Sequence, residues 1–233
     1  MQCNVCGSVE FKAMNGGSNR RCGRCDSLER TRVCKLIIDK KQLARPGMRI
    51  LHLAPERGLA DFFRHTVGDN FYDPRDIDTE RYQDINVTKF NLINSANLPS
   101  EYFDLIIHHH VMEHPACNIT AVLYHLHRSL SKSGIHMFTI PIYDGRYDEA
   151  FGDLSSAERE RRFGQYDHVR RFTREDLPLT LGMVFKLPDY DLTTLASEKE
   201  LQNHNIPKFA WTGFSSHTVF MFSKGDILLK SNY

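Results

Sequence analysis

Four cysteines near the start of the chain have the spacing of a metal site. They fall as Cys3-x2-Cys6 and Cys22-x2-Cys25, with 15 residues between the two pairs. In a reducing compartment this spacing indicates tetrahedral zinc, because each short loop can aim two thiolates at one ion. Four thiolates leave no coordination position open, so we expect a structural rather than a catalytic Zn²⁺. Disulfides are the alternative reading, and a cytosolic location disfavours them.

A second set of candidate residues surrounds a short apolar run. Residues 49–64 read RILHLAPERGLADFFR, in which a turn at 54–56 and Gly58 separate the run from a helical pattern. A strand that turns tightly into a helix begins many nucleotide sites, because a helix N-terminus offers free N–H groups to an anion. About 18 residues beyond Gly58 stands Asp76, whose carboxylate could accept both hydroxyls of a ribose. The motif G-x-G-x-x-G is missing, so a purely structural turn stays open.

The pattern beyond residue 48 predicts the scaffold that positions these residues. Strand-like apolar runs occur at 49–54, 70–73, 103–109, 134–142, 183–187 and 217–223. Helical patterns lie between the early runs, as at 118–130, and alternating strands and helices predict a mostly parallel α/β sheet covered on both faces. The last two runs have no clear helix between them, which suggests a closing antiparallel pair at one edge. Ligands of such sheets bind beyond the carboxyl ends of the strands.

The N-terminal region is expected to form its own unit. Asp26 and Glu29 have the spacing of a capping box, which would open a helix over 27–38. Pro46-Gly47 ends this segment. We therefore predict a zinc ribbon with its linking helix at 1–46 and an α/β domain at 47–233.

The composition excludes several classes of protein. A chain of 233 residues with 41% hydrophobic and 25% charged residues is typical of a globular protein with one α/β domain and a small appendage. No apolar stretch approaches the roughly 20 residues of a membrane helix. The N-terminus lacks a basic-then-apolar signal pattern, so we expect a cytoplasmic protein without a membrane partner.

The net charge of +1 conceals an asymmetry between the two ends. Residues 1–49 hold 11 Lys and Arg against 4 Asp and Glu, or +7, and the remainder holds 19 against 25, or −6. The basic end could meet a phosphate-bearing partner. Alternatively, its arginines balance the charge of metal-bound thiolates.

Five blocks of the sequence resemble class I S-adenosylmethionine-dependent methyltransferases, and more closely a bacterial subgroup with an N-terminal zinc ribbon. In chain order they are CNVCG…RCGRCDSLERTR, ILHLAPERGL, DIDTERY, FDLIIHHHVMEH and FGQYDHVRRF. The resemblance implies a Rossmann-like class I methyltransferase sheet, mostly parallel with an antiparallel edge strand, beside a small zinc ribbon. It also implies S-adenosylmethionine as the methyl donor, in addition to the structural zinc.

The resemblance also implies the residues of the cofactor site. Asp76 would bind the ribose hydroxyls, and Asn86 stands where the family usually has the Asp that accepts the adenine amino group. Glu56 would face the ammonium or sulfonium of the cofactor. The expected cofactor-binding residues are Leu53, Ala54, Pro55, Glu56, Gly58, Asp76, Ile77, Asn86, Val87, His109, His110 and His114.

Methyl transfer to a hydroxyl or amine requires a proton acceptor. The candidates are Tyr166, Asp167 and His168 in FGQYDHVRRF, with His114 in VMEHP as another. Asp167 beside His168 is the more attractive pair, because a histidine near its working pKa suits proton abstraction. The alternative is that these residues organise a lid over the cofactor. The three histidines at 108–110 point alternately to opposite faces of a strand, so we do not expect them to share a metal.

The favoured function is methyl transfer to an oxygen or nitrogen of a small-molecule or glycan-type acceptor. An RNA methyltransferase that grips nucleic acid with the basic ribbon is one alternative. It is less favoured because the ribbon has no aromatic residue except Phe11 and the body is acidic. A cofactor-binding scaffold without catalysis is the other, suggested by the altered turn at 54–56 and by Asn86.

Overall fold

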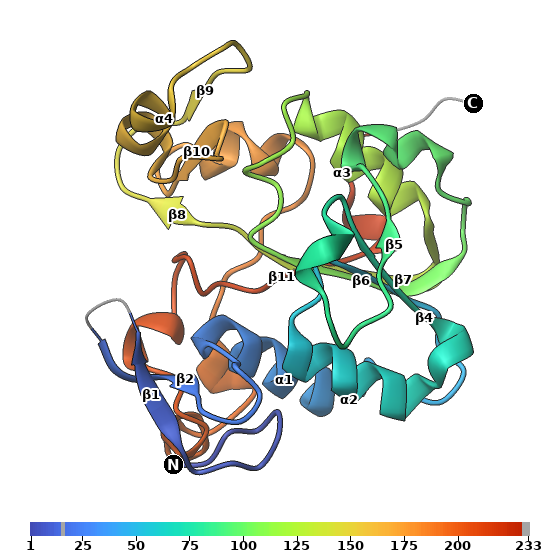
Figure 1. Ribbon diagram of the computed structural model, residues 1–233, viewed down its shortest axis with the longest axis vertical. Coiled ribbons are helices and arrows are strands. Elements are labelled where there is room, and N and C mark those ends of the chain that lie inside the picture. Colours follow the sequence, from blue (N-terminus) through green and yellow to red (C-terminus); the bar gives the residue numbers. More distant parts are fainter. Residues whose placement is uncertain (15–16, 230–233) are drawn as a thin grey trace.

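Figure 1 shows the computed structural model, in which residues 1–14 and 17–229 are described. The strands are β1 (Phe11–Met14), β2 (Gly17–Cys22), β3 (Ile50–Leu53), β4 (Tyr72–Asp76), β5 (Thr88–Lys89), β6 (Phe103–His109), β7 (Leu130–Thr139), β8 (Ile142–Tyr143), β9 (Asp148–Glu149), β10 (Arg170–Thr173) and β11 (Phe220–Ser223). The α-helices are α1 (Glu29–Lys41), α2 (Arg57–Val67), α3 (Ile119–Arg128), α4 (Ser156–Phe163) and α5 (Glu198–Asn203). Short 3₁₀ turns join many of them.

The central sheet has the strand order β11-β7-β6-β3-β4-β5. All neighbouring strands in it are parallel except β7 and β11, which pair antiparallel. From β3 the chain builds outward through β4 and β5, and then returns to build through β6 and β7 on the other side. The strand order therefore reverses between β3 and β6, which is where doubly wound sheets bind their ligands. The prediction of a mostly parallel, Rossmann-like sheet with an antiparallel edge strand is confirmed.

The prediction of a strand at 183–187 is wrong. A 3₁₀ turn ends at Met183, and Phe185 makes only an isolated bridge to Ile227. The edge strand β11 pairs instead with β7, where Phe220 lies opposite Phe138. Phe185 is buried, and its ring stacks on that of Phe222 with centroids 4.2 Å apart. The apolar run at 183–187 thus fills the core by side-chain packing without strand pairing.

Successive residues of the inner strands face opposite sides of the sheet. Ile50 of β3 packs with α1 and α2 in one core, and the next residue, Leu51, packs with α3 in the other. The strands β6 and β7 divide their apolar residues in the same way. This alternation follows from the two-residue period of a strand, and it explains why the inner strands read as continuous apolar runs.

Helix α1 belongs to the sheet core and also carries the N-terminal hairpin of β1 and β2. Val33 and Ile37 of α1 lie in the same buried cluster as Leu59 of α2. The guanidinium of Arg32, which is fully buried, donates to the carbonyls of Arg20 in β2 (3.1 Å) and of Asn205 (2.9 Å). The hairpin is therefore held both to α1 and to the segment that follows α5, as its position in Figure 1 shows.

The expected capping box of Asp26 and Glu29 is not formed. Helix α1 begins after Leu28, whose N–H donates to Oγ1 of Thr31 (3.1 Å). Asp26 pairs with Arg21 at 2.8 Å, and the buried Glu29 pairs with Arg20 at 2.6 Å. Each carboxylate pairs with an arginine of β2, so neither acts as an N-terminal cap.

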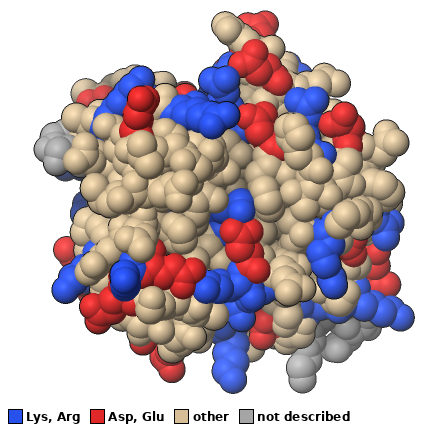
Figure 2. Space-filling view, turned by 90° about the horizontal axis from the view of Figure 1, so that it is seen from below, with Lys and Arg blue, Asp and Glu red and all other residues tan. Residues whose placement is uncertain are grey.

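Much of the basic charge near the N-terminus is neutralised inside the fold. Besides Arg20 and Arg21, Arg30 forms an ion pair with Glu56 at 2.9 Å. Figure 2 shows one face of the molecule, on which basic and acidic side chains are interspersed. The pairs that join the basic end to the acidic remainder, Arg30–Glu56 and Lys40–Glu200, account for part of the charge asymmetry without a phosphate-bearing partner. Among residues 1–14 and 17–229, no helix has both the length and the apolar character needed to cross a membrane.

A separate lobe follows the fifth strand of the central sheet. Its three short strands have the order β8-β10-β9, and α4 packs beside them at the upper left of Figure 1. The side chain of Arg162 at the end of α4 pairs with Asp148 of β9 at 2.6 Å. Backbone hydrogen bonds tie this lobe to the loop after β6, because the N–H of Val169 donates to the carbonyl of Glu113 (3.0 Å).

Candidate functional site

The four N-terminal cysteines converge as the spacing predicts. The Sγ atoms of Cys3 and Cys25 are 3.7 Å apart and those of Cys6 and Cys22 are 3.5 Å apart. All four sulfur atoms lie within 4.8 Å of one another, and all six cysteines of the chain are free thiols. Zn–S bonds of about 2.3 Å in a tetrahedron place the sulfurs about 3.8 Å apart, whereas a disulfide joins them at about 2.05 Å. The cluster therefore fits a zinc ion.

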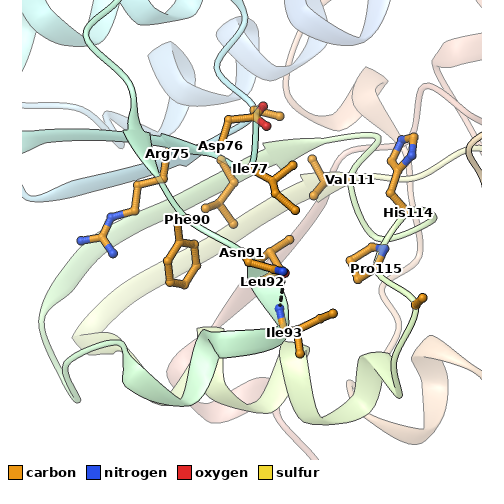
Figure 3. Close-up of a pocket in the computed structure, with 13 residues that line it drawn as sticks. Arg75, Asp76, Ile77, Phe90, Asn91, Leu92, Ile93, Val111, His114 and Pro115 are labelled. Carbon is orange, nitrogen blue, oxygen red and sulfur yellow. Dashed lines mark hydrogen bonds between the residues drawn. The ribbon is translucent and has the colours of Figure 1, made fainter. Parts of the chain in front are cut away.

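An apolar cavity of about 190 Å³ opens at the carboxyl ends of the central strands. Figure 3 shows side chains from opposite sides of this cavity, with Asp76 and Ile77 on one side and Val111 and His114 on the other. Its lining consists of Leu53, Ala54, Arg75, Asp76, Ile77, Phe90, Asn91, Leu92, Ile93, Val111, His114, Pro115 and Ala116. The cavity lies beside the reversal of strand order, where the sequence predicted the cofactor.

Asp76 is the buried acid of this cavity. Its carboxylate accepts hydrogen bonds from the N–H of Asp78 (2.9 Å) and the hydroxyl of Tyr82 (2.5 Å). Burial, followed by the hydrogen bond to Asp76, raises the pKa of Tyr82, so this phenol stays a donor. An ionised carboxylate has about four acceptor positions, which leaves two for a ligand. Asp76 can therefore receive two further hydroxyl groups without losing its own contacts.

Asn86 and Val87 do not line the cavity, and Asn91 stands there instead. Asn86 lies at a separate hollow beside Arg64 and Tyr72. The strand that leads to the cavity, β5, comprises only Thr88–Lys89, so no apolar run marks it in the sequence. Asn91 follows this strand, and its side-chain oxygen accepts from the N–H of Ile93 (3.0 Å), as Figure 3 shows. The amide N–H₂ of Asn91 has no hydrogen bond to the described part of the chain.

The residues around the turn after β3 face two different places, the cavity and the N-terminal unit. Leu53 and Ala54 line the cavity, whereas Pro55, Glu56 and Gly58 do not. Ala54 has a φ of 49°, a left-handed conformation for which glycine is the usual residue.

Glu56 and Gly58 contact the N-terminal unit. The carboxylate of Glu56 accepts from Arg30 (2.9 Å) and Thr31 (2.7 Å), both on α1. A Cβ on Gly58 would lie 2.9 Å from Cγ1 of Val5 and 3.2 Å from Cβ of Cys25. We call the segment that carries the four cysteines (3–14 and 17–25) the cysteine hairpin. Gly58 is therefore small because the cysteine hairpin packs against α2.

Arg30 lies on α1, beside the turn that contains Glu56 and near the carboxyl end of β6. Its Nε is buried and has no hydrogen-bond partner in the described part of the chain. Burial, and next the charge of Arg30, lower the pKa of His109 and of His110 to about 3. Arg30 thus places an incompletely paired cation near the carboxyl end of β6. No local pattern in the sequence marks Arg30, because its ion-pair partner Glu56 lies in another element.

The predicted residues at the end of β6 are neutral and do not line the cavity. His109 is buried with Nδ1 3.2 Å from Oγ1 of Thr139. His110 has a φ of 51°, and its Nε2 donates to the carbonyl of Ser216 (3.1 Å). Of the three histidines predicted for the cofactor site, only His114 reaches the cavity.

The candidate catalytic residues pair differently from the sequence prediction. Asp167 lies 3.4 Å from Nδ1 of His114, and not against its chain neighbour His168. His168 is buried, with Nε2 3.9 Å from Oε1 of Glu113. We call Glu113, His114, Asp167 and His168 the histidine–carboxylate cluster. Tyr166 is 58% exposed and has no hydrogen bond within the described chain. Glu113 was missed in the sequence, although it stands in the tract HHHVMEH.

Arg170 fixes the loop that carries Glu113 and His114. It is fully buried, and its guanidinium donates to the carbonyls of Met112, Pro115 (2.8 Å) and Cys117 (2.7 Å). Its Nε pairs with Glu149 at 2.9 Å. One planar side chain thus satisfies three carbonyls of the loop, a geometry that lysine cannot reproduce. This role explains the arginine in the sequence block FGQYDHVRRF.

Comparison with known proteins gives structural similarities only. No family model and no curated protein matches the sequence. Many solved structures are similar to this chain, and several of them are S-adenosylmethionine-dependent methyltransferases. One from Archaeoglobus fulgidus is 16% identical, with 82% of this chain and 92% of that chain covered and a TM-score of 0.44. Another from Mesorhizobium loti is 18% identical, with 49% and 58% covered and a TM-score of 0.36.

A third similar structure is the 1,6-didemethyltoxoflavin-N1-methyltransferase of Burkholderia thailandensis, solved with its substrate and S-adenosylhomocysteine. It is 16% identical, and the alignment covers 63% of each chain with a TM-score of 0.42. This chain spans less than two thirds of the length of the second and third of these proteins. The fold is the Rossmann-like class I methyltransferase sheet that the sequence predicted, as its own strand order shows.

Proposed function

We propose that the chain is an S-adenosylmethionine-dependent methyltransferase that binds the nucleoside of its cofactor in the cavity beside Asp76. The observation that carries this proposal is the buried carboxylate of Asp76 at the end of β4, facing an apolar cavity with two acceptor positions free. The two ribose hydroxyls would occupy these positions. Ile77, Ile93 and Val111 offer apolar walls for the adenine ring, and the Asn91 amide offers a polar edge.

Arg30 is proposed to receive the carboxylate of the cofactor's methionine moiety. A cation with an unpaired buried Nε lies near the end of β6, whereas Glu56, the carboxylate of the turn, is already held by α1. The site would then use a residue of the N-terminal unit to bind the donor. The zinc ribbon supports this arrangement, because it packs on α2 and precedes α1 directly.

The acceptor is proposed to be a hydroxyl or amine of a small molecule or glycan. His114 is shared by the cavity and the histidine–carboxylate cluster, so the acceptor would enter from the side of the cluster. The exposed rings of Phe151 and Tyr166 lie in the lobe on this side and can stack on a sugar or another ring. A member of the histidine–carboxylate cluster would accept the proton of the acceptor. In this proposal the cluster has the role that the sequence assigned to Asp167 and His168 alone.

The pairing of the ribbon arginines argues against the RNA methyltransferase alternative. Arg20, Arg21 and Arg30 each have a carboxylate partner, and Arg32 is buried. Among the six arginines of residues 1–46, only Arg24 and Arg45 are exposed without an ion pair to the described part of the chain. An RNA-binding surface needs unpaired cations that release counterions from phosphates. We therefore retain the small-molecule or glycan acceptor as the proposal.

Calorimetry with S-adenosylhomocysteine and with 5′-methylthioadenosine, which lacks the carboxylate, tests the two binding contacts separately. Asp76→Asn is expected to weaken both ligands by about 10- to 100-fold, the effect of losing a charge-assisted hydrogen bond. Arg30→Met is expected to weaken only S-adenosylhomocysteine, and Arg30→Lys should recover part of the loss. Asp78→Asn, an exposed neighbour, is the matched control.

Turnover separates the enzyme from the non-catalytic scaffold. Labelled S-adenosylmethionine is supplied with a panel of glycans, phenols and amines, and transfer of the label is measured. Product from at least one hydroxyl or amine is the expected result. Tight cofactor binding without any product would favour the scaffold, and no cofactor binding at millimolar concentration would overturn the proposal.

A further inference from the structure

The carboxylate of Glu113 is buried without a partner. Its side chain is 0% exposed, and neither oxygen has a hydrogen bond to the part of the chain that the structure describes. Burial raises the pKa of Glu113 to about 8. A buried carboxylate is normally paired or bound to a metal, because leaving it unpaired costs several kcal/mol. Glu113 therefore needs a further group to account for its position.

Two imidazoles converge on this carboxylate. The ligand atoms of Glu113, His114 and His168 all lie within 4.8 Å of one another. Nδ1 of His168 is 3.3 Å from the carbonyl of Phe163, which can only accept, so Nδ1 carries the proton. Nε2 is then a lone pair that faces Oε1 of Glu113 at 3.9 Å. A histidine that donates one nitrogen to a carbonyl and turns the other toward a carboxylate has the orientation of a metal ligand.

The surrounding backbone holds these groups in place. Arg170 binds three carbonyls of the loop around Glu113, and the N–H of Val169 donates to the carbonyl of Glu113 itself. Because Val169 follows His168 in the chain, this hydrogen bond holds the segment of His168 against the loop that carries Glu113. Further oxygen and nitrogen donors lie close by, since Asp167 is 3.4 Å from His114 and His110 is 3.8 Å from Glu113.

We propose that Glu113, His114 and His168 bind a divalent first-row metal ion, separate from the zinc of the cysteine hairpin. Two histidines and one carboxylate form a common ligand set for such ions, and three protein ligands leave positions open. His114 also lines the cavity, so an open position is directed toward the methyl donor's side of the site.

The role of this ion, which rests on the proposed function, is to bind an acceptor hydroxyl. A bound cation lowers the pKa of an oxygen that it coordinates. The O–H bond then breaks, and the proton passes to the half-exposed carboxylate of Asp167. The oxygen's electron pair forms the new O–CH₃ bond while the S–CH₃ bond breaks, and the sulfonium leaves as a neutral thioether. Because the ion acts on an oxygen that it coordinates, the proposed class of acceptor is restricted to hydroxyl compounds.

Metal binding is measured on protein whose cysteine hairpin is already loaded with zinc. Mn²⁺ is followed by electron paramagnetic resonance, since it prefers oxygen and nitrogen ligands to thiolates, and added Zn²⁺ is followed by calorimetry. Wild type is expected to bind one added ion per chain. Glu113→Gln and His168→Ala should weaken binding at least tenfold. His65→Ala, an exposed histidine bonded only within α2, is the matched control.

Thermal unfolding excludes misfolding as the cause of a loss. An ion that binds only the folded chain raises its melting temperature. Mn²⁺ is expected to stabilise wild type and not Glu113→Gln, while the variant without ion melts no lower than wild type, because glutamine has nearly the shape of glutamate and buries no charge. No binding of either probe by wild type, or equal binding by Glu113→Gln, overturns the proposed site. These measurements need no cofactor, so their outcome is independent of S-adenosylmethionine binding.

Discussion

Gly58, in the first turn of α2, lies directly against Cys25 of the cysteine hairpin. A Cβ built on Gly58 would be 3.2 Å from both Cβ and the carbonyl oxygen of Cys25, and 2.9 Å from Cγ1 of Val5. The segment that carries the four cysteines and the helix that follows the turn after β3 therefore share one packed contact. The missing side chain at Gly58 makes this close contact possible.

The substitution Gly58→Ala tests this contact. In an ordinary helix Gly→Ala stabilises by about 1 kcal/mol, but overpacking costs about 1–3 kcal/mol. We expect the steric term to prevail, because Cys25 belongs to the cluster of four converging cysteines and Val5 lies between two of them in the chain, so neither can easily move. The free energy of unfolding should fall in a denaturant titration. Gly152→Ala, where the added Cβ meets no atom within 4 Å, is the control. A stabilised Gly58→Ala would show that the hairpin is loosely docked.

Loss of the hairpin's metal is expected to propagate to the cofactor site. Cys22→Ser should abolish the zinc that survives dialysis and lower the melting temperature, because structural zinc supplies the folding free energy of such units. It should also weaken S-adenosylhomocysteine, since α1 carries both Arg30 and the contacts to Glu56. Cys117→Ser, outside the cluster, should keep one zinc per chain. Unchanged ligand affinity in Cys22→Ser would show that α1 holds its position without the hairpin.

The sequence was sufficient for the central sheet wherever a strand is a continuous apolar run. β3 and β6 are buried on both faces, so their runs are uninterrupted and easily recognised. The run at 183–187 has the same local appearance, yet Phe185 reaches the core from a nearly unpaired segment. Local hydrophobicity reports burial and does not report pairing. The sequence does not reveal β5, because both of its residues are exposed and no apolar run marks the strand.

The site could be predicted only where one strand end determines a residue's position. Asp76, at the end of β4, reaches the cavity as expected, whereas Asn86 precedes the short β5 and Asn91 follows it. Glu56 is turned away by partners on α1, about 25 residues earlier in the chain. The pairing of Asp167 with His114 likewise depends on how the lobe of β8, β9 and β10 docks on the β6 loop. Such contacts between distant elements leave no local pattern.

Arg170 is expected to be essential for that docking. Arg170→Lys keeps the charge but loses the planar fork that binds three carbonyls, leaving some of them unsatisfied. We expect a loss of unfolding free energy on the order of 3 kcal/mol, because each carbonyl that loses its donor costs about 1–3 kcal/mol. Methyl transfer should fall further than cofactor affinity, because Glu113 and His114 move while Asp76 does not. Arg161→Lys, in an exposed pair with Glu158, is the control and should change stability by less than about 0.5 kcal/mol. Equal stability of the two variants would contradict this role.

Two buried histidines on neighbouring strands give the fold a pH dependence. His108 of β6 and His136 of β7 are both 0% exposed, and their Nε2 atoms are 3.0 Å apart. One imidazole must donate and the other accept, so both are neutral. Burial lowers the pKa of each well below its ordinary value of 6.5. Because the folded pKa lies below that of the unfolded chain, the pair's contribution to stability is present above pH 6.5 and is lost as the pH falls.

The double substitution His108→Phe/His136→Phe should remove this dependence. The pair lies among aromatic rings, where His108 stacks on Phe138 with centroids 4.9 Å apart, so phenylalanine suits both positions. Each histidine that is protonated only on unfolding changes the free energy of unfolding by about 1.4 kcal/mol per pH unit. Denaturant titrations at pH 7 and pH 5 should therefore show that the unfolding free energy of wild type falls more steeply than that of the variant. The difference in slope corresponds to about two more protons taken up by wild type on unfolding. His65→Phe, on the exposed face of α2, should keep the wild-type slope. If the double variant and wild type have parallel pH profiles, the two imidazoles are not the groups that acid protonates on unfolding.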